Sequence, residues 1–418
     1  MIWLDVTKSA AARHRSGLTR VTMRLAEELG AAATRWSAAS GRAGPTPGVG
    51  KRTPFEDYRL TSRGPMSQIA DRWGSRVIAI DLPEDRCADT FLTAEVFAPS
   101  ERPGFDDFLA RRPCRCVAIY HDSIPLRLPQ ITWPQAVARH PAYLSMLAQF
   151  DLVWAVSAAS REELLGFWQW QGRTQVPEVR VLALGADLNA IHHPTASAGG
   201  ARPSPYTKAS GDRPGALDQP QSRSDALAPL RQGFGEQGGR VPPMLLCVGI
   251  LEPRKNQTFL LEVADRLWAE GIAFELHFVG RVNPHFGKPV LANLRALQRK
   301  RAGLSYDGPM SDQRLAELYQ SATTCVFPTI AEGCGLPLLE ALWWGTPCVA
   351  SDLPSLVENA RGGGCLVLPT NQTEAWTLAL RRILTEPNAQ ADLADAARRR
   401  QPQLPTWAQA AGSILRDL

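Results

Sequence analysis

The stretch FPTIAEGCGLPLLEALWWGTPCVASDLPSLVE, residues 327–358, contains the unit from which the fold is built. It opens at the end of one apolar run, CVFPT, and a second apolar run, TPCVAS, follows later; both are typical of buried strands. Between them, LPLLEALWW carries an apolar stripe at helical spacing, starts around Pro337 and is ended by Gly345. Strand, helix and strand in this order predict a βαβ unit within a parallel sheet.

The same alternation continues along the whole chain. In the first half, the expected strands are MIWLDV, RVIAID, CVAIYHD, LVWAVS and VRVLAL, with helices in LTRVTMRLAEEL, HPAYLSMLAQF and SREELLGFWQW. In the second half, the expected strands are PMLLCVGIL, FELHFVG, CVFPT and TPCVAS, with helices in QTFLLEVADRLWAEG, RLAELYQSA and LPLLEALWWG. This pattern predicts an α/β protein with two doubly wound, Rossmann-like domains and a ligand cleft between them.

A change of composition marks the boundary between the halves. Residues 194–241 are rich in Pro, Gly, Ser and Gln, which predicts a flexible linker or insertion between domains at 1–193 and 242–400. The linker contains GFGEQG, residues 233–238, which fits the dinucleotide-binding pattern G-x-G-x-x-G. That fingerprint needs a strand before it and a helix after it, and neither is present. We therefore expect no dinucleotide cofactor.

Bulk properties exclude several classes of protein. The net charge of +5 comes without a long run of Lys or Arg, so no nucleic-acid partner is expected. No signal peptide and no 18-residue apolar stretch is visible, and the eight cysteines are scattered, so we expect a cytoplasmic protein with reduced thiols. LLGFWQWQG, residues 164–172, could insert aromatic rings peripherally into the cytoplasmic membrane, although a packed core helix is favoured.

The opening stretch also carries two acids eight positions apart. Glu332 lies on the loop before the helix, and Glu340 lies about one turn into it. The N–H groups of residues 333–336 (Gly333, Cys334, Gly335 and Leu336) lie beside the positive end of the helix dipole, which suits a phosphate. The acids would repel phosphate, but carboxylates accept hydrogen bonds from sugar and ribose hydroxyls. This pattern predicts a nucleotide-sugar site; a helix cap with one exposed acid explains the spacing equally well.

A second segment makes the ligand site the better interpretation. In VGILEPRKNQ, residues 248–257, a buried strand ends before Arg254 and Lys255, and Asn256 is the expected N-cap of the next helix. A guanidinium fork and an ammonium group together suit a diphosphate. A solvated Arg-Lys pair in a turn is the simpler alternative, but two helix starts that can bind an anion in one domain favour the site.

The first half contributes two further candidates. His121 ends the strand in CVAIYHDSIP, where it could bind a phosphate or sugar oxygen and titrate near neutrality, or bond its own loop. Gly17 precedes a helix in SGLTRV and could let a ligand approach the backbone closely.

Taken together, these segments resemble the retaining glycosyltransferases of family 4, which have the GT-B fold of two facing Rossmann-like domains. The region 327–358 is similar to the E-x7-E region of that family. LEPRKN, DGPMSDQRLAELYQSA, SGLTRV and YHDSIPL match at the expected places in the chain. Cys334 departs from the pattern, since the family usually has a bulky residue there. The C-terminal residues 401–418 look like the helix that crosses back to the N-terminal domain in this fold.

The resemblance implies roles for the candidate residues. Glu332 and His121 would be the catalytic candidates at the transferred sugar, and Glu340 would hold the ribose. Arg254 and Lys255 would neutralise the leaving diphosphate, while residues 333–336 and Gly17 would meet the sugar and phosphates. Family members usually need no metal and no cofactor, because basic side chains and helix dipoles stabilise the diphosphate.

The resemblance therefore implies a metal-independent hexosyltransferase. The favoured donor is GDP-mannose, and the acceptor is a hydroxyl of a glycan or lipid-linked saccharide in polysaccharide biosynthesis. The alternatives are a nucleotide-sugar epimerase, a phosphorylase, or a nucleotide-sugar binder without turnover, all on the same fold. The acceptor, the linkage and the oligomeric state stay open.

Overall fold

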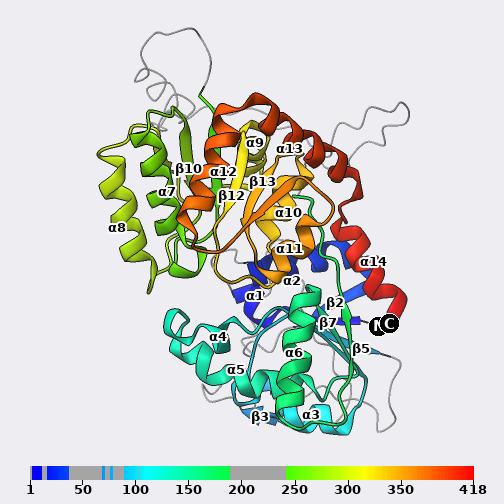
Figure 1. The fold of residues 1–418 in the computed structure, drawn as a ribbon. Helices are drawn as coiled ribbons and strands as arrows, with labels where there is room; N and C mark the ends of the chain where they lie inside the picture. Colours follow the sequence, from blue (N-terminus) through cyan, green and yellow to red (C-terminus); the bar gives the residue numbers. More distant parts are fainter. Residues whose placement is uncertain are drawn as a thin grey trace, which may run out of the picture.

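The structure is a computed structural model that describes residues 2–11, 17–36, 68–70, 76–78, 89–102, 104–188 and 242–418. The expected linker at 194–241, with its GFGEQG run, lies outside these described residues. The described parts form two α/β units that lie one above the other, with helices α1 and α2 near the boundary between them (Figure 1).

The N-terminal unit is built on a six-stranded sheet in which every pairing is parallel. The strand order is β2-β1-β5-β6-β7-β8, so the direction of winding reverses between β1 and β5. Its strands are β1 (Ile2–Asp5), β2 (Ala33–Trp36), β5 (Thr90–Thr93), β6 (Arg115–Tyr120), β7 (Leu152–Ala155) and β8 (Glu178–Val181).

The C-terminal unit has a second all-parallel sheet of six strands, in the order β11-β10-β9-β12-β13-β14. Here the winding reverses between β9 and β12. In open α/β sheets, ligands bind outside the carboxyl ends of the strands at such a reversal. Its strands are β9 (Met244–Val248), β10 (Glu275–Val279), β11 (Leu304–Tyr306), β12 (Thr324–Phe327), β13 (Cys348–Ser351) and β14 (Cys365–Leu368).

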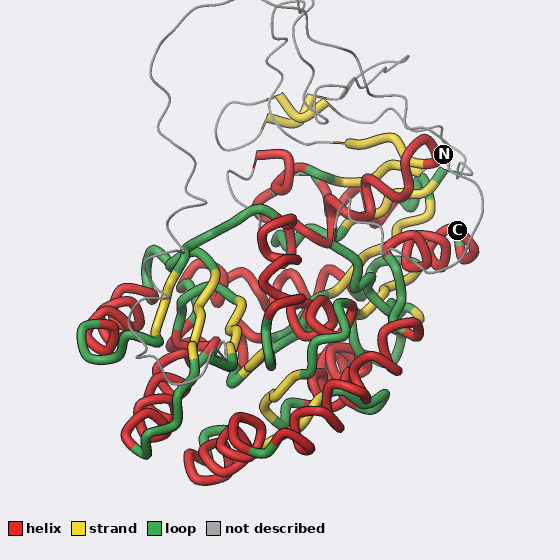
Figure 2. Tube along the Cα trace, turned by 90° about the horizontal axis from the view of Figure 1, so that it is seen from above, coloured by secondary structure: helices red, strands yellow, loops and turns green. Residues whose placement is uncertain are grey.

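Helices cover both faces of each sheet (Figure 2). Those of the N-terminal unit are α1 (Thr7–Ala11), α2 (Gly17–Leu29), α3 (Phe105–Arg111), α4 (Ile124–Arg127), α5 (Pro134–Leu147) and α6 (Ala158–Trp170). Those that follow are α7 (Gln257–Ala269), α8 (Gly287–Gln298), α9 (Asp312–Ser321), α10 (Leu336–Trp343), α11 (Pro354–Ala360), α12 (Thr373–Thr385), α13 (Pro387–Arg400) and α14 (Trp407–Asp417).

The expected fold class is confirmed, but one expected strand belongs elsewhere. RVIAID was expected in the parallel sheet, whereas its first residues form β4 (Arg76–Ile78), which pairs antiparallel with β3 (Gln68–Ala70) in a separate two-stranded sheet. A short apolar run does not specify its partner, because pairing depends on the rest of the fold. Strands β2, β5, β11 and β14 were not expected from the sequence; they have only three or four residues each.

Helix α14 packs on the N-terminal unit although it lies at the end of the chain (Figure 1). Trp407 and Ile414 are buried in one core cluster with Leu4 of β1 and Val21 of α2. Leu336, at the start of α10, is part of the same cluster. This core therefore contains side chains from both halves of the sequence.

Candidate active site

The loop between β12 and α10, together with α10 itself, holds six of the ten predicted site residues. Gly335 occupies the N-cap position of α10 in the left-handed conformation, with φ 83°, which glycine adopts at little cost. Pro337 is the second residue of the helix, where its missing N–H leaves no hydrogen bond unmade. Glu332 lies on the loop and Glu340 lies inside the helix, as the spacing predicted.

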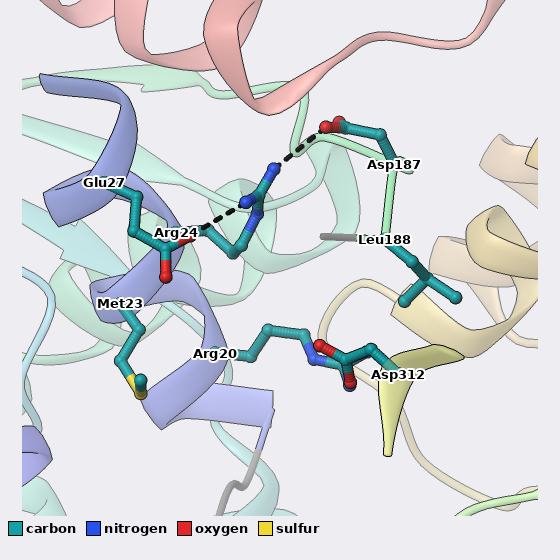
Figure 3. A pocket seen from close by; sticks show the side chains of 7 residues that line it. All are labelled: Arg20, Met23, Arg24, Glu27, Asp187, Leu188 and Asp312. Carbon is teal, nitrogen blue, oxygen red and sulfur yellow. Dashed lines mark hydrogen bonds and ion pairs between the residues drawn. The ribbon is translucent and has the colours of Figure 1, made fainter. Parts of the chain in front are cut away.

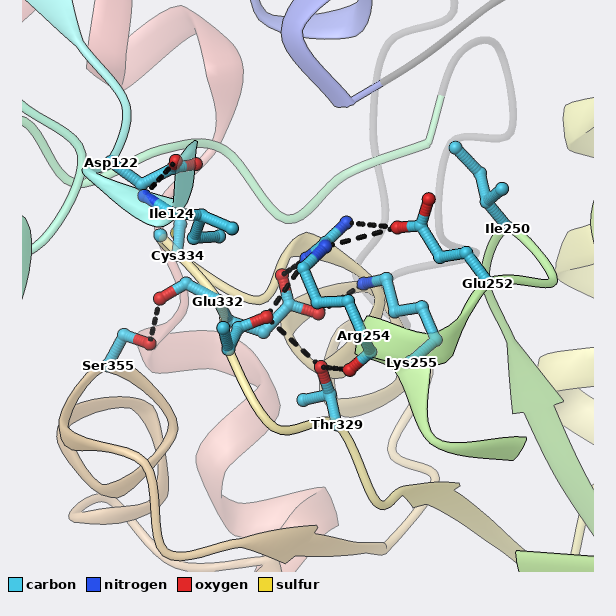
Figure 4. Close-up of polar contacts among 12 residues, drawn as sticks. Asp122, Ile124, Ile250, Glu252, Arg254, Lys255, Thr329, Glu332, Cys334 and Ser355 are labelled. Carbon is cyan, nitrogen blue, oxygen red and sulfur yellow. Dashed lines mark hydrogen bonds and ion pairs between the residues drawn. The ribbon is translucent and has the colours of Figure 1, made fainter. Parts of the chain in front are cut away.

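Glu332 lies between the two predicted cations (Figure 4). Its carboxylate forms an ion pair with Lys255 and accepts a hydrogen bond from Nη1 of Arg254 at 3.3 Å. The Glu332 side chain is only 12% exposed. Burial raises the pKa of this carboxyl group, but Lys255 and Arg254 outweigh burial, so the net pKa lies below its ordinary value. Glu332 is therefore ionised at neutral pH.

Arg254 has most of its donors committed within the protein. Its Nε and Nη2 donate to one oxygen of Glu252 at 3.1 and 2.7 Å, and Nη1 also donates to the carbonyl of Ala331 at 2.9 Å. Burial lowers the pKa of this guanidinium, yet Glu332 and Glu252 raise it further, so the net direction is upward. Arg254 thus shapes the loop as well as carrying charge.

Lys255 has more capacity for a ligand than Arg254. An ammonium group has three donors, and within the described part of the chain Lys255 uses one of them, on Glu332. The two positive charges of Arg254 and Lys255 are balanced by the two negative charges of Glu252 and Glu332. A diphosphate therefore needs attraction from other groups of the site as well.

The glycine loop can supply that attraction. Among hydrogen bonds between described residues, none uses the backbone N–H of Gly333, Cys334 or Gly335 as a donor. These groups lie at the N-terminus of α10, where the helix dipole adds partial positive charge. They are therefore available for an anionic ligand.

The loop also touches the N-terminal unit. A Cβ atom on Gly333 would lie 2.5 Å from the carbonyl oxygen of His121, so no larger residue fits without a shift. The carbonyl of Gly333 accepts hydrogen bonds from the hydroxyls of Ser157 and Ser160 at 2.6 and 3.1 Å. Ser157 is also the N-cap of α6, where its side chain accepts from Ser160 N–H. The start of α6 thus holds the glycine loop in place.

His121 lies at the end of β6 and is 7% exposed. Its Nε2 lies 2.9 Å from the carbonyl oxygen of Ala94. A carbonyl only accepts, so Nε2 carries the proton and Nδ1 is the acceptor of the neutral ring. Burial lowers the pKa of His121, although the Ala94 carbonyl opposes this. The ring is therefore neutral at neutral pH, and its titration does not lie at neutrality as the sequence suggested.

Glu340 is buried, with 3% of its surface exposed. One carboxylate oxygen is ion-paired with Arg20 of α2, and the other accepts a hydrogen bond from the Tyr319 hydroxyl at 3.0 Å. Glu340 is therefore bound from the N-terminal unit as well as from its own.

Gly17 and Asn256 are two further residues that the sequence singled out. Gly17 is the first residue of α2, it is exposed, and a Cβ atom there would have nothing within 4 Å. Asn256 does stand at the N-cap of α7, but its side chain makes no cap hydrogen bond. Its backbone is left-handed with φ 56°, and its amide nitrogen donates instead to the Pro328 carbonyl and to Asn371, at 3.0 and 2.8 Å.

Cys334 and Leu336 pack rather than expose their side chains. Cys334 contacts both the core cluster that includes α14 and the one behind α10, and Leu336 is 9% exposed. Burial raises the pKa of the Cys334 thiol to about 12, so it is neutral at neutral pH. The place of Cys334 at the contact between the units favours a small side chain.

The aromatic segment 164–172 divides between core and surface. Trp168 is 1% exposed, and its indole N–H donates to the Leu144 carbonyl at 2.8 Å, whereas Trp170 is 81% exposed. No helix in the described part of the chain has the length and apolar character needed to cross a bilayer. The same residues contain no group of three His, Cys, Asp or Glu side chains that could hold a metal ion.

Two parallel-sheet units, with a diphosphate-competent helix start at the switch point of the second, define the GT-B class of fold. The residues 242–386 match the family described as "Glycosyl transferases group 1". The C-terminal unit is thus a group 1 glycosyltransferase domain, and the family resemblance seen in the sequence is confirmed.

Individual relatives agree with this assignment. The chain is 27% identical over 314 residues to the serotype-specific mannosyltransferase WbdA of Escherichia coli, covering 74% of this chain and 34% of that protein. It is 35% identical over 131 residues to O-antigen chain mannosyltransferase B of Escherichia coli, covering 31% and 34% of the two chains. The chain therefore spans about a third of the length of these curated relatives.

A solved structure supports the fold independently. The sucrose-phosphate synthase of Thermosynechococcus elongatus superposes with a TM-score of 0.63 and 19% identity, covering 100% of this chain and 98% of that one. At this level of identity the likeness establishes the GT-B fold.

Sequence reasoning did not identify several residues that shape the site, namely Arg20, Ser157, Ser160, Glu252 and Tyr319. Arg20 was within the matched run SGLTRV, but a charge near a helix start is usually solvated. Ser157 and Ser160 lie ahead of an amphipathic run, where the pattern predicts the start of a helix. It gives no information on the contact that these serines make with the Gly333 carbonyl.

Proposed function

We propose that this chain is a retaining hexosyltransferase that moves a hexose from a nucleoside-diphosphate sugar to a hydroxyl of a glycan or lipid-linked saccharide. The observation that carries the proposal is the arrangement of Glu332 and Lys255 beside the N–H groups of Gly333 to Gly335, which donate to no residue that the structure describes. It combines a fixed carboxylate with donors for a departing diphosphate.

The chemistry requires charge to be stabilised in two places. As the glycosidic bond to the diphosphate breaks, negative charge grows on the leaving oxygen, and Lys255 and the N–H groups of the loop stabilise it. Positive charge grows on the sugar ring, and the ionised Glu332 stabilises it or fixes the sugar hydroxyls. Arg254 holds the loop that carries Glu332 in place through its hydrogen bonds to Glu252 and to the Ala331 carbonyl.

His121 would act as a hydrogen-bond acceptor toward the sugar. Its Nε2–H donates to the Ala94 carbonyl, and no described residue donates to Nδ1, so the lone pair there can accept from a sugar hydroxyl. Since burial keeps the ring neutral, it adds no charge to the sugar site.

GDP-mannose is the proposed donor and mannose the transferred sugar, because two relatives are named mannosyltransferases. The proposed acceptor is a saccharide like that of an O-antigen chain, because one relative is named an O-antigen chain mannosyltransferase. No metal ion is needed in this proposal, since Lys255 and the start of α10 take the place of a divalent cation at the diphosphate.

The test is release of free nucleoside diphosphate from a panel of GDP-, UDP- and ADP-hexoses, with and without saccharide acceptors and with EDTA present. The proposal expects GDP from GDP-mannose, dependent on acceptor and unaffected by EDTA. Proton NMR of the first product formed should show the anomeric configuration of the donor. Release without an acceptor, or conversion of the donor to another nucleotide sugar, would identify a hydrolase or an epimerase instead.

A further inference from the structure

Arg20 is the residue through which the N-terminal unit reaches the nucleotide side of the candidate site. It projects from α2 toward α9, beside a hollow lined by Arg20, Met23, Arg24, Glu27, Asp187, Leu188 and Asp312 (Figure 3). Its guanidinium pairs with Glu340 and, through Nη2, with Asp312 at 3.1 Å. Both acids belong to the C-terminal unit, so this contact joins the two halves of the molecule.

The contact leaves Glu340 able to bind a ligand. A carboxylate has about four acceptor positions. Arg20 uses one on one oxygen, and the Tyr319 hydroxyl uses one on the other at 3.0 Å. The remaining positions can accept from two vicinal hydroxyls, such as those of a ribose.

Arg20 and Tyr319 also fix the orientation of the Glu340 carboxylate. Arg20 and Glu340 are mostly buried, with 21% and 4% of their side chains exposed, so solvent screens the pair weakly. Glu340 on its own unit has a hydroxyl partner in Tyr319, whereas its cationic partner comes from α2.

We propose that Arg20 is a positioning residue for nucleotide binding: it orients the Glu340 carboxylate, so that the ribose-binding group is complete only when the two units are in contact. This inference rests on the proposed function, in which Glu340 holds the ribose. It assigns to α2 a part in donor binding that acts through Glu340.

Arg24 provides a matched control on the same helix. It lies one turn further along and is 11% exposed, and it pairs with Glu27, Glu28 and Asp187. None of these partners is a predicted site residue. Substituting Arg24 therefore removes a similar buried cation at the same interface without changing Glu340.

The experiment measures nucleotide affinity by isothermal titration calorimetry on the full chain. The nucleoside diphosphate that the unaltered chain binds best among GDP, UDP and ADP serves as the probe, together with its 2′,3′-dideoxy form. Arg20→Gln should weaken binding of the ribose form by about tenfold to a hundredfold, the effect of losing a charge-assisted hydrogen bond, while Arg24→Gln should change it by less than about twofold.

The dideoxy probe separates the proposed role from a direct contact. Without ribose hydroxyls, Glu340 has nothing to bind, so Arg20→Gln and the unaltered chain should bind the dideoxy form equally. An equal loss for both probes would mean that Arg20 contacts another part of the nucleotide, and equal ribose binding in Arg20→Gln would overturn the proposal outright.

Two further results complete the test. Arg20→Lys keeps the charge and should lose only a few-fold in ribose binding, which gives the same selective signature if Arg20→Gln does not fold; a uniform loss in Arg20→Lys would count against the proposal. If the unaltered chain binds none of the three nucleotides, the proposed function itself fails, and this inference fails with it.

Discussion

At the scale of single residues, Glu332 and Glu340 differ in which unit supplies their cationic partner. Glu332 is paired with Lys255 and Arg254 inside the C-terminal unit, whereas Glu340 is paired with Arg20 from the N-terminal unit. The ion pairs of the two acids therefore depend on different contacts. The environment of Glu332 is set locally, and that of Glu340 depends on contact between the units.

The role proposed for Glu332 predicts a large loss of activity when its charge is removed. Glu332→Gln should reduce hexosyl transfer by about a hundredfold or more, the range seen when one group that stabilises the transition state is deleted. Glu270→Gln is the control, because Glu270 is an exposed surface acid paired with Arg381. Initial rates of GDP release give the measurement, and a Glu332→Gln rate close to that of the control would remove Glu332 from the mechanism.

The same substitution should change how stability depends on pH. The pKa of Glu332 is lowered in the folded chain, so its ionised form contributes stability above its ordinary pKa of 4.5. That contribution is lost as the pH falls through the lower folded pKa. The difference in unfolding free energy between the unaltered chain and Glu332→Gln should thus be largest near pH 7 and shrink below about pH 4.5. Urea unfolding at several pH values measures it; a constant difference would contradict the pairing.

At the scale of elements, the glycine loop and the start of α6 form one contact. Ser157 and Ser160 hold the Gly333 carbonyl, and the N–H of Ala158 donates to Glu358 of α11 at 2.9 Å. The loop is thus fixed from the N-terminal unit while its N–H groups stay available. A loop held in this way keeps its donors aimed at one position, which reduces the cost of ordering them during the reaction.

Gly333→Ala tests this contact. The added Cβ would lie 2.5 Å from the His121 carbonyl, so the loop must move or the units must separate. Because a displacement of about 1 Å can cost a hundredfold in rate, we expect transfer to fall by about tenfold to a hundredfold.

Gly166→Ala is the matched control for Gly333→Ala. Gly166 lies within α6 with nothing within 4 Å of an added Cβ, so alanine should stabilise the helix by about 0.5–1 kcal/mol and leave the rate unchanged. Melting temperature and GDP release together distinguish the two variants. Full activity in Gly333→Ala would show that the close approach does not matter for function.

Prediction from sequence worked best for elements with a strong local pattern. Helix α10 begins at Leu336, one residue before the expected Pro337, because Gly335 and Pro337 specify its start through their backbones alone. β5, by contrast, was missed because TFLT is short and half of it is threonine. All four of its residues are buried because it lies inside the sheet and both faces are covered: Phe91 belongs to one core cluster and Leu92 to another.

At the scale of the whole molecule, α14 links the end of the chain to the first core. Trp407 is 2% exposed, and its backbone N–H donates to Asp187 at 2.7 Å, while Ala186 donates to the Pro405 carbonyl at 2.9 Å. The segment after β8 and the segment before α14 therefore run together. The helix completes the N-terminal core although its end is far from the core strands in sequence: Arg115 of β6 donates a hydrogen bond to the carbonyl of Asp417, 302 positions away.

Trp407→Ala should destabilise the chain by about 3–5 kcal/mol, the usual cost of deleting a buried tryptophan. The control is Trp170→Ala, because Trp170 is 81% exposed and its removal should change stability by less than about 0.5 kcal/mol. Urea unfolding followed by circular dichroism compares the two. Similar midpoints for both variants would mean that α14 does not stabilise the N-terminal unit.

The sequence alone determined the alternation of strands and helices, the start of α10 to within one residue of Pro337, and the types of side chain available at Glu332, Lys255 and Glu340. These features depend on local rules: periodicity, backbone preference and charge. Only the tertiary structure decided the partners, such as Arg20 for Glu340 and Ser157 for the Gly333 carbonyl. These partners are 320 and 176 residues apart, and a contact over such distances exists only when two separately formed sheets pack together.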